Sequence, residues 1–306
     1  MTYHPAVDLR GTLKRVVRRG LEPLLETGRW HHPTWPARGI DRFVVSFPKS
    51  GRTWLRVLMG AAEGARSGVP LEKASAEWLR RDSPALEGHP VLFTHGLASS
   101  PGEPSAHMEL FQRYIADRTR VFLVRDPRDT VVSYYFQQVK RRGGQYGDVP
   151  EKVADFARHP FYGVDRIVDF LNVSQRAFDA GTGPALIVSY EGLHVQPAEL
   201  LATIFRFLGA AGVPANAIAR AIEYSRFENM RKMETRRGFG GPGAVLRPAD
   251  PNDAESFKTR KGKVGGYTDY FSADEVEWID ARIRERLVPA MGYATPGAAP
   301  ALRERP

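Results

Sequence analysis

The chain has 306 residues, 42% hydrophobic and 26% charged, values typical of a globular protein with a substantial core. It contains no cysteine, which excludes disulfides, zinc–thiolate sites and thiol nucleophiles and fits a reducing compartment. The net charge of +9 favours an anionic partner: a nucleic acid, an anionic membrane or an acidic small ligand. No zinc-finger spacing supports nucleic-acid binding, and no run of apolar residues is long enough to predict a membrane span.

The first predicted element is a basic amphipathic helix, because residues 10–27 place lysines and arginines among leucines and valines at helical spacing. We expect it in an N-terminal extension, residues 1–40, that packs on or beside the domain; peripheral contact with an anionic membrane is the alternative. No continuous apolar region follows the basic residues, so a secretory signal is not expected. His31 and His32 lack further ligands at a supporting spacing, so no metal site is predicted.

The next stretch indicates a strand, a tight loop and a helix. An apolar run at residues 43–47 is followed by Pro48, Lys49, two small residues and an apolar-periodic segment from Thr53. A loop that opens a helix presents backbone N–H groups, and Lys49 adds a full charge, so an anion such as phosphate is the expected ligand. An ordinary turn with a surface lysine is the alternative. The loop is not a Walker A motif, because Lys49 precedes Gly51 instead of following a glycine.

A second buried strand, residues 90–94, ends at His95. Ligands of open α/β sheets gather at the carboxyl ends of strands, and the ordinary pKa of histidine lies near neutrality. His95 is therefore a candidate general base, with a structural, hydrogen-bonded histidine as the alternative.

A third strand, residues 120–124, leads through Arg125 into a helix that starts with a proline and that Asp126 is suited to cap. Arginine suits phosphate oxygens, and Ser133 lies about two turns into this helix, so both could face one ligand. A structural network of Arg125 with Asp126 and Asp129 is the alternative.

The whole pattern alternates strands with helices. Strands are predicted near residues 43, 91, 121 and 185, and helices over 71–79, 105–117, 161–179, 197–209, 214–224 and 273–287. This alternation predicts one α/β domain, residues 41–292, with a parallel sheet and helices on both faces. The glycines and charges of 225–270 predict long, mobile loops, either a lid or a solvated excursion. The Pro- and Ala-rich residues 293–306 are expected to form a flexible tail.

Five segments, in order along residues 43–271, resemble motifs of the sulfotransferases that use 3′-phosphoadenosine 5′-phosphosulfate (PAPS). The run P-K-S-G-x-T-W at 48–54 resembles the 5′-phosphosulfate loop, and Arg125 with Ser133 resembles the 3′-phosphate motif. Three further segments resemble the adenine contacts and the loop over the 3′-phosphate: Tyr190, Ser225 with Phe227, and Arg260-Lys261-Gly262. The resemblance implies a single-domain, P-loop-kinase-like fold without a Walker A loop.

The resemblance also implies residue roles. Lys49 would hold the 5′-phosphate and the leaving-group oxygen, His95 would take a proton from an acceptor hydroxyl or amine during in-line attack on sulfur, and Ser133 would complete the catalytic set. The donor, or its product adenosine 3′,5′-bisphosphate (PAP), would contact Lys49, Ser50, Gly51, Arg52, Thr53, Trp54, Arg125, Ser133, Tyr190, Ser225, Phe227, Arg260, Lys261 and Gly262. No metal is implied, because fixed cations can neutralise the leaving phosphate.

The sequence departs from this family in two places. Phe93 stands where many cytosolic members have a lysine that helps to stabilise the transferring group, and Gly265-Gly266-Tyr267 replaces the usual G-D-W. Lys49 would then be the main cation at the reacting centre, unless another residue such as Arg52 assists. These changes indicate a bacterial-type branch and leave the acceptor open.

We therefore expect a cytoplasmic enzyme with a small-molecule or glycolipid acceptor and no nucleic-acid partner. Two other functions compete. A nucleotide kinase is disfavoured by the missing Walker A order and by the lack of an evident magnesium-site aspartate. A non-catalytic protein that binds nucleic acid or membrane through its charge would not need a histidine at a strand end.

Overall fold

The computed structural model describes residues 39–81, 83–96, 98, 104–142, 149–236, 239 and 246–306. The predicted basic helix at 10–27, and with it the proposed membrane contact, lies outside these residues. None of the helices in the described ranges is long and apolar enough to cross a membrane.

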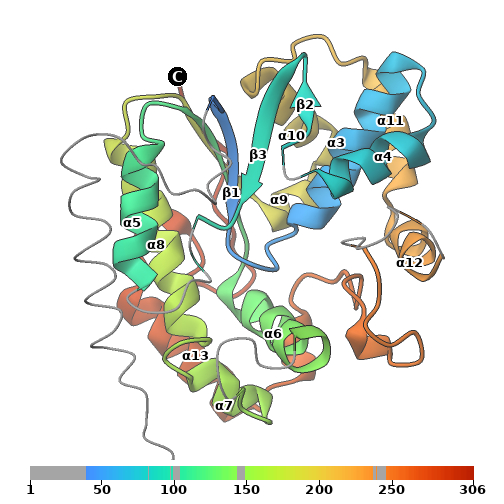
Figure 1. Ribbon diagram of the computed structural model, residues 1–306. Coiled ribbons are helices and arrows are strands. Elements are labelled where there is room, and N and C mark those ends of the chain that lie inside the picture. Colours follow the sequence, from blue (N-terminus) through green and yellow to red (C-terminus); the bar gives the residue numbers. More distant parts are fainter. Residues whose placement is uncertain are drawn as a thin grey trace, which may run out of the picture.

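A mixed sheet of six strands, in the order β2-β3-β1-β4-β5-β6, forms the centre of the described structure (Figure 1). Its four central strands are parallel: β1 (Arg42–Ser46), β3 (His89–Thr94), β4 (Thr119–Val124) and β5 (Ala185–Ser189). They are the four strands predicted from the sequence. Their nearly continuous apolar runs are buried on both faces, as parallel strands require.

Two short antiparallel strands edge the sheet, and the sequence analysis missed both. β2 (Ala85–Leu86) pairs with β3, and β6 (Arg303–Arg305) pairs with β5. The C-terminal residues are therefore not the flexible tail that we predicted. Tyr293 is fully buried, and the Arg305 guanidinium donates to the carbonyls of Gly181 and Gly183, so specific contacts override the Pro- and Ala-rich composition.

Helices cover both faces of the sheet. Phe43 and Val45 point into a core shared with α5 (Pro104–Tyr114), α8 (Val164–Ala180) and α13 (Ala273–Arg286). Val44, between them, points to the opposite core, which is formed with α3 (Arg52–Ser67), α4 (Leu71–Arg80), α10 (Pro197–Phe207) and α11 (Ala215–Tyr224). Figure 1 shows these two layers on either side of the strands.

The described ranges contain further elements, most of them short. They are α6 (Pro127–Gln137), a π-helical turn η1 (Gln138–Arg142), α7 (Val153–Arg158), α9 (Tyr190–Val195), α12 (Phe227–Thr235), and the short 3₁₀ turns η2 (Ala254–Ser256), η3 (Gly266–Asp269) and η4 (Pro289–Met291).

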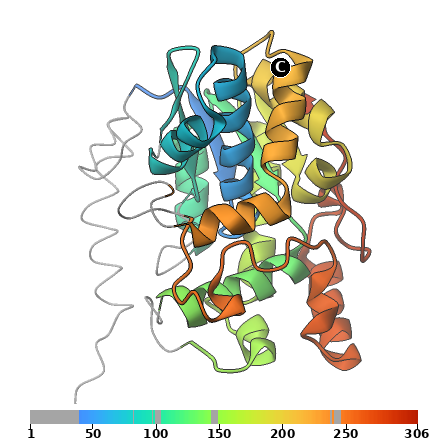
Figure 2. The same cartoon turned by 90° about the vertical axis from the view of Figure 1, so that its right-hand side faces the viewer.

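Helix α12 corrects the prediction of loops over 225–270. Its residues Met230 and Met233 are buried against Val57 of α3 and Leu79 of α4, and this packing fixes a helix that its polar composition does not indicate. In Figure 2, α12 and the segment after it (orange) lie between α3 (blue) and α6 (green).

The order of the central strands positions the site. β1 and β4 are neighbours, but the helix after β1, α3, packs on one face of the sheet, whereas the helix after β4, α6, packs on the other. Such a switch point opens a crevice at the carboxyl ends of the two strands. Lys49 follows β1 and Arg125 follows β4, so both residues enter this crevice.

Candidate active site

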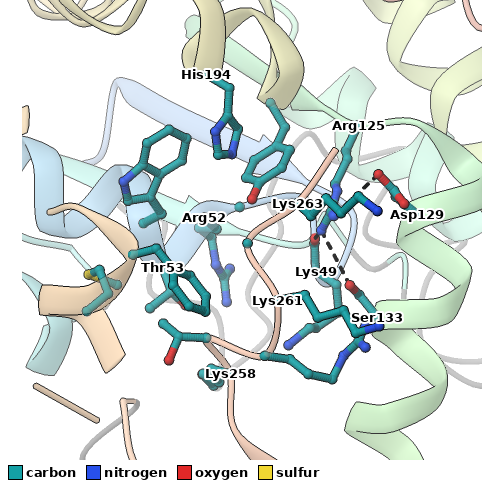
Figure 3. Close-up of a pocket in the computed structure, with 18 of the residues that line it drawn as sticks. Lys49, Arg52, Thr53, Arg125, Asp129, Ser133, His194, Lys258, Lys261 and Lys263 are labelled. Atoms are coloured by element: carbon teal, nitrogen blue, oxygen red, sulfur yellow. Dashed lines mark hydrogen bonds and ion pairs between the residues drawn. The ribbon is translucent and has the colours of Figure 1, made fainter. Parts of the chain in front are cut away.

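A cavity of about 660 Å³ occupies the crevice and collects almost the whole predicted site (Figure 3). The predicted residues that line it are Lys49, Gly51, Arg52, Thr53, Trp54, His95, Arg125, Ser133, Tyr190, Ser225, Phe227, Arg260, Lys261 and Gly262. Ser50 is the exception: it is buried beneath the loop, where its N–H donates to Phe47 O.

The loop after β1 turns sharply. Lys49 and Gly51 adopt positive φ angles of 74° and 93°, a region that costs a residue with a side chain. At Gly51 a Cβ atom would lie 2.4 Å from the Tyr190 ring, so only glycine fits there. Because Gly51 is also the N-cap of α3, no side chain caps the helix, and its first N–H groups are left for a ligand.

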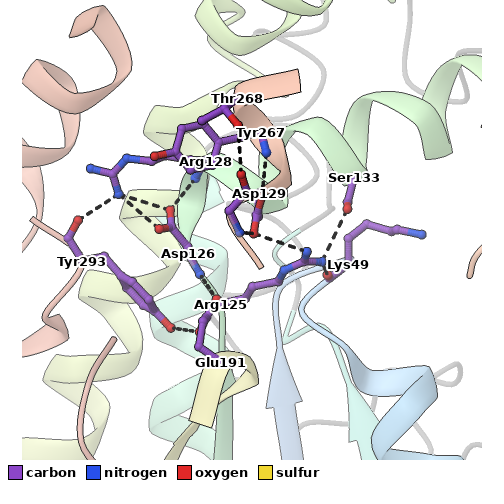
Figure 4. Close-up of polar contacts among 11 residues, drawn as sticks. Lys49, Arg125, Asp126, Arg128, Asp129, Ser133, Glu191, Tyr267, Thr268 and Tyr293 are labelled. Atoms are coloured by element: carbon purple, nitrogen blue, oxygen red, sulfur yellow. Dashed lines mark hydrogen bonds and ion pairs between the residues drawn. The ribbon is translucent and has the colours of Figure 1, made fainter. Parts of the chain in front are cut away.

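Four residues hold Arg125 in place, and Figure 4 labels three of them, Lys49, Asp129 and Ser133. Its Nη1 donates to Lys49 O at 3.0 Å and to Ser133 Oγ at 3.4 Å, and its guanidinium lies 4.3 Å from the centre of the Tyr190 ring. Its Nη2 lies 3.7 Å from Asp129 Oδ2. The predicted pair Arg125 and Ser133 therefore meets in one place.

Asp129 links α6 to the loop that carries Arg260 and Lys261. Its two carboxylate oxygens accept from the backbone N–H groups of Gly265, at 2.8 Å, and Tyr267, at 3.0 Å (Figure 4). The alternative of a structural Arg–Asp network thus holds for Asp129, and it coexists with the predicted phosphate site.

A second buried network lies behind Arg125 (Figure 4). Asp126 caps α6 by accepting from Arg128 N at 2.8 Å, and its own N–H donates to Glu191 Oε1 at 3.0 Å. The Tyr293 hydroxyl donates to Glu191 Oε2 at 2.8 Å. Burial raises the pKa of Asp126 to about 7, although the Arg128 guanidinium partly offsets this effect.

Arg260 and Lys261 line the cavity but are paired within their own loop. Arg260 Nη1 lies 3.3 Å from Glu255 Oε2, and Lys261 Nζ lies 2.9 Å from Asp269 Oδ2. Gly262 follows with a φ angle of 61°, and a Cβ atom there would lie 2.4 Å from the Phe227 ring. A bound phosphate would either share these two cations with the carboxylates or replace the carboxylates as their partner.

Aromatic rings form another part of the cavity wall. Trp54 Nε1 donates to Ser225 O at 3.2 Å, and the Trp54 ring lies 5.7 Å from Tyr190 and 4.6 Å from His194. Phe227, partly exposed, begins α12. Sequence analysis missed His194, whose pKa is lowered by burial and by the nearby Arg125.

His95 is positioned by the neighbouring strand. Its Nδ1 lies 2.8 Å from Ser46 O. A carbonyl oxygen can only accept, so Nδ1 carries the proton and Nε2 is the basic nitrogen of the neutral ring. Because His95 lines the cavity, this tautomer suits a proton acceptor.

Positive charge dominates the cavity. Its basic lining residues are Lys49, Arg52, Arg125, Arg141, Arg226, Lys258, Arg260, Lys261 and Lys263. Burial, and then the charge of Arg141, lower the pKa of Lys49 to about 7. Burial, and then the charge of Lys49, lower the pKa of Lys258 well below its ordinary value.

Glu234 is a structural residue that sequence analysis missed. This fully buried carboxylate of α12 accepts from Lys258 N at 2.6 Å, Thr259 N at 2.9 Å and Thr259 Oγ1 at 2.6 Å. It fixes the segment before Arg260. No sequence signal marked Glu234, because its partners lie 24 and 25 positions further along the chain.

Fold and cavity together define the class of protein: an α/β protein whose parallel strands end at a largely basic cavity that aromatic rings and a histidine also line. Within the described ranges, no group of His, Asp and Glu residues could hold a metal ion. Residues 40–289 match the Sulfotransferase domain family, so the chain belongs to the sulfotransferase family.

Relatives and solved structures agree with this assignment. The chain is 27% identical to cytosolic sulfotransferase 17 of Arabidopsis thaliana, over 87% of this chain and 80% of that protein. It is 24% identical to flavonol 3-sulfotransferase of Flaveria bidentis, over 87% and 88%. A mouse sulfotransferase crystallised with PAP superposes with a TM-score of 0.56 at 21% identity, over 87% of this chain and 90% of that one. The superposition confirms the predicted fold class.

Proposed function

We propose that this protein transfers a sulfuryl group from PAPS to a hydroxyl or amine of a small-molecule acceptor. One observation carries the proposal: Lys49, His95 and the pair Arg125–Ser133, from separate strand ends, line a single cavity. Membership of the sulfotransferase family supports it. So do a related flavonol enzyme and a structural neighbour crystallised with PAP.

The residues of the cavity fit this donor. The glycine at 51 lets the Tyr190 ring pack against the loop, and as an N-cap without a side chain it leaves the first N–H groups of α3 for a 5′-phosphosulfate. Arg125 and Ser133 suit the 3′-phosphate, and Trp54 with Phe227 suits the flat faces of an adenine.

The donor supplies an activated sulfuryl group, whose bond to the bridging phosphate oxygen breaks as the bond from the acceptor oxygen or nitrogen to sulfur forms. His95 Nε2 accepts the proton of the attacking group. Lys49 neutralises the phosphate oxygen that departs with the electron pair, so PAP is released. Arg125, oriented by Ser133 and Tyr190, anchors the nucleotide away from the reacting atoms.

The proposal is tested by calorimetric titration with PAP, AMP and ATP in the absence of metal. We expect PAP to bind more tightly than AMP by at least the roughly 1.4 kcal/mol that corresponds to tenfold, because only PAP carries a 3′-phosphate for Arg125. Equal affinities, or ATP binding that requires magnesium, would contradict the donor assignment and favour a nucleotide kinase.

A further inference from the structure

The reacting centre needs a second positive group, and the chain does not supply it at Phe93. That ring is 3% exposed, packs at 6.1 Å from the Trp78 ring and belongs to the core beneath α3. Arg52 lines the cavity, but its Nη1 donates to Phe93 O at 3.1 Å. A sulfuryl group in transfer carries negative charge on oxygens other than the one that Lys49 would hold.

We propose that Lys258 is this second cation and that its ammonium contacts the non-bridging oxygens of the sulfuryl group. This inference rests on the proposed function and deepens it by adding a catalytic residue. It is carried by three features: the place of Lys258 in the cavity wall, the way its backbone is fixed, and the lack of a carboxylate partner among the described residues.

Lys258 reaches the cavity from a segment remote from the loop of Lys49. Both residues line the same space as Arg52 (Figure 3), and His95 also lines it. After burial, the charge of Lys49 has the largest effect on the pKa of Lys258, so the two ammonium groups influence each other. An anion between them would meet a positive group on each side.

The backbone at Lys258 is rigidly fixed. Glu234 accepts the N–H groups of Lys258 and Thr259, and Arg141 Nη1 donates to Ser256 O at 2.7 Å just before them. A group that stabilises a transition state must be positioned before the reaction, because reorganisation during the reaction costs free energy. Glu234 and Arg141 provide that positioning.

Lys258 differs from the neighbouring cations of its loop. Lys261 is paired with Asp269 and Arg260 with Glu255, whereas Lys258 forms no ion pair with any residue in the described ranges. The carboxylate of Glu234 raises the pKa of Lys258, but its oxygens already accept hydrogen bonds from the backbone. An anion that contacts Lys258 would therefore break no existing pair.

The electrostatics support this geometry. Burial and the surrounding Lys49, Arg141 and Arg52 lower the pKa of Lys258, so its charged form is disfavoured while the cavity holds no anion. An anionic group in contact with Lys258 raises that pKa again, and the charged ammonium then attracts the anion. During transfer, His95 takes the acceptor proton, and Lys49 donates to the phosphate oxygen that leaves sulfur with the electron pair of the broken bond. Lys258 donates to the sulfuryl oxygens throughout.

Orthovanadate with PAP tests the inference without any acceptor, because five-coordinate vanadium mimics a sulfuryl group in transfer. We would measure PAP affinity, and then vanadate affinity of the PAP complex, for wild type, Lys258→Met and the control Lys232→Met. Lys232 is exposed on α12 and does not line the cavity. Lys258→Met should weaken vanadate binding by about 10- to 100-fold, the effect of one charged hydrogen bond. PAP affinity of Lys258→Met, and both affinities of the control, should stay close to wild type.

Each other outcome has a distinct meaning. Unchanged vanadate binding in Lys258→Met would overturn the inference, and so would an equal loss of PAP and vanadate affinity in a variant with wild-type melting. Failure of wild type to bind PAP would instead overturn the proposed function. If Lys258→Met does not fold, Lys258→Arg replaces it: the guanidinium stays charged, so the vanadate affinity of this variant should fall less steeply than that of wild type as the pH is raised. An identical fall would overturn the role of Lys258.

Discussion

Lys49 combines a left-handed backbone with a strongly perturbed ammonium group. Its φ angle is 74°, and burial, followed by the charge of Arg141, lowers its pKa to about 7. Sites that hold a charged group in such a conformation are commonly functional. A ligand phosphate favours the protonated form, so binding and protonation of Lys49 are linked.

This linkage gives a pH prediction. In the ligand-free protein Lys49 is largely neutral above its pKa of about 7, whereas PAP bound at Lys49 as proposed would raise that pKa. Near pH 8, PAP binding should therefore take up about one proton, and PAP affinity should fall as the pH rises. Calorimetry in buffers of different ionisation enthalpy measures the uptake, and Lys49→Met should reduce it. Binding that takes up no proton would contradict the role of Lys49.

His95 gives a different prediction, because in the proposed reaction it acts on the acceptor and not on the donor. His95→Ala should lower turnover by roughly 10²- to 10⁴-fold, the contribution of a general base, while PAP affinity changes little. PAP release with simple phenols as acceptors measures turnover, and calorimetry measures affinity. If PAP affinity fell as much as turnover, His95 would have a structural role.

Residues within contiguous motifs could be predicted, whereas residues that act across the fold could not. Lys49, Arg125 and Arg260 each lie in a recognisable local pattern. Asp129 binds Gly265 N from 136 positions away, and Glu234 binds Lys258 N from a helix that looked like a loop. Only the folded chain brings these partners together, so no spacing in the sequence reports them.

At the scale of elements, the loop between β1 and α3 depends on a glycine for two separate reasons. Gly51 has a φ angle of 93°, and a Cβ atom would collide with Tyr190 at 2.4 Å. At the other end of α3, Gly68 has a φ angle of 73° but nothing lies within 4 Å of its Cβ position. A side chain at Gly68 would therefore cause backbone strain alone, whereas a side chain at Gly51 would also collide with Tyr190.

We expect Gly51→Ala to lose most PAP affinity and to destabilise the fold by about 1–3 kcal/mol, because the loop must move away from Tyr190. The matched control Gly68→Ala should cost only the left-handed strain, about 1–2 kcal/mol, and keep PAP affinity. Denaturant unfolding and calorimetry measure the two effects. Similar losses of PAP affinity in both variants would show that the collision with Tyr190 is unimportant.

Elements with strong periodicity were predictable and elements fixed by packing were not. The central strands and helices such as α10 have continuous or amphipathic apolar patterns. Helix α12 is polar apart from Phe227 and its two buried methionines, and β6 has the sequence Arg-Glu-Arg. Their structure comes from neighbours in space, α3 for one and β5 for the other.

At the scale of the whole molecule, the buried network of Asp126, Glu191 and Tyr293 joins α6, the end of β5 and the C-terminal segment. Alternation of strands and helices sufficed to predict the parallel sheet and the crevice at its switch point. This alternation could not predict that the C-terminal residues return to pair with β5 as the edge strand β6, because a strand of three residues has no recognisable sequence pattern. The network makes global stability sensitive to pH.

Asp126→Asn isolates this sensitivity. The folded-state pKa of Asp126 is about 7, above the 3.8 of an ordinary aspartate. The contribution of this group to the free energy of unfolding is therefore fully present below about pH 4 and is lost as the pH rises through about 7. Asparagine can still cap α6 but does not titrate. Urea unfolding should therefore show wild type losing stability relative to Asp126→Asn between these pH values. A constant difference would mean that Asp126 stays ionised in the fold.

The ion pairs of Arg260 with Glu255 and of Lys261 with Asp269 give the loop internal substitutes for a phosphate. Salt normally weakens the binding of a polyanion, because it screens each attraction. Here salt also weakens the ion pairs between these cations and their carboxylates, so part of the loss of PAP affinity is offset. The affinity for PAP should consequently depend less steeply on ionic strength than the number of cations in the cavity would imply, which distinguishes a built nucleotide site from a merely basic surface.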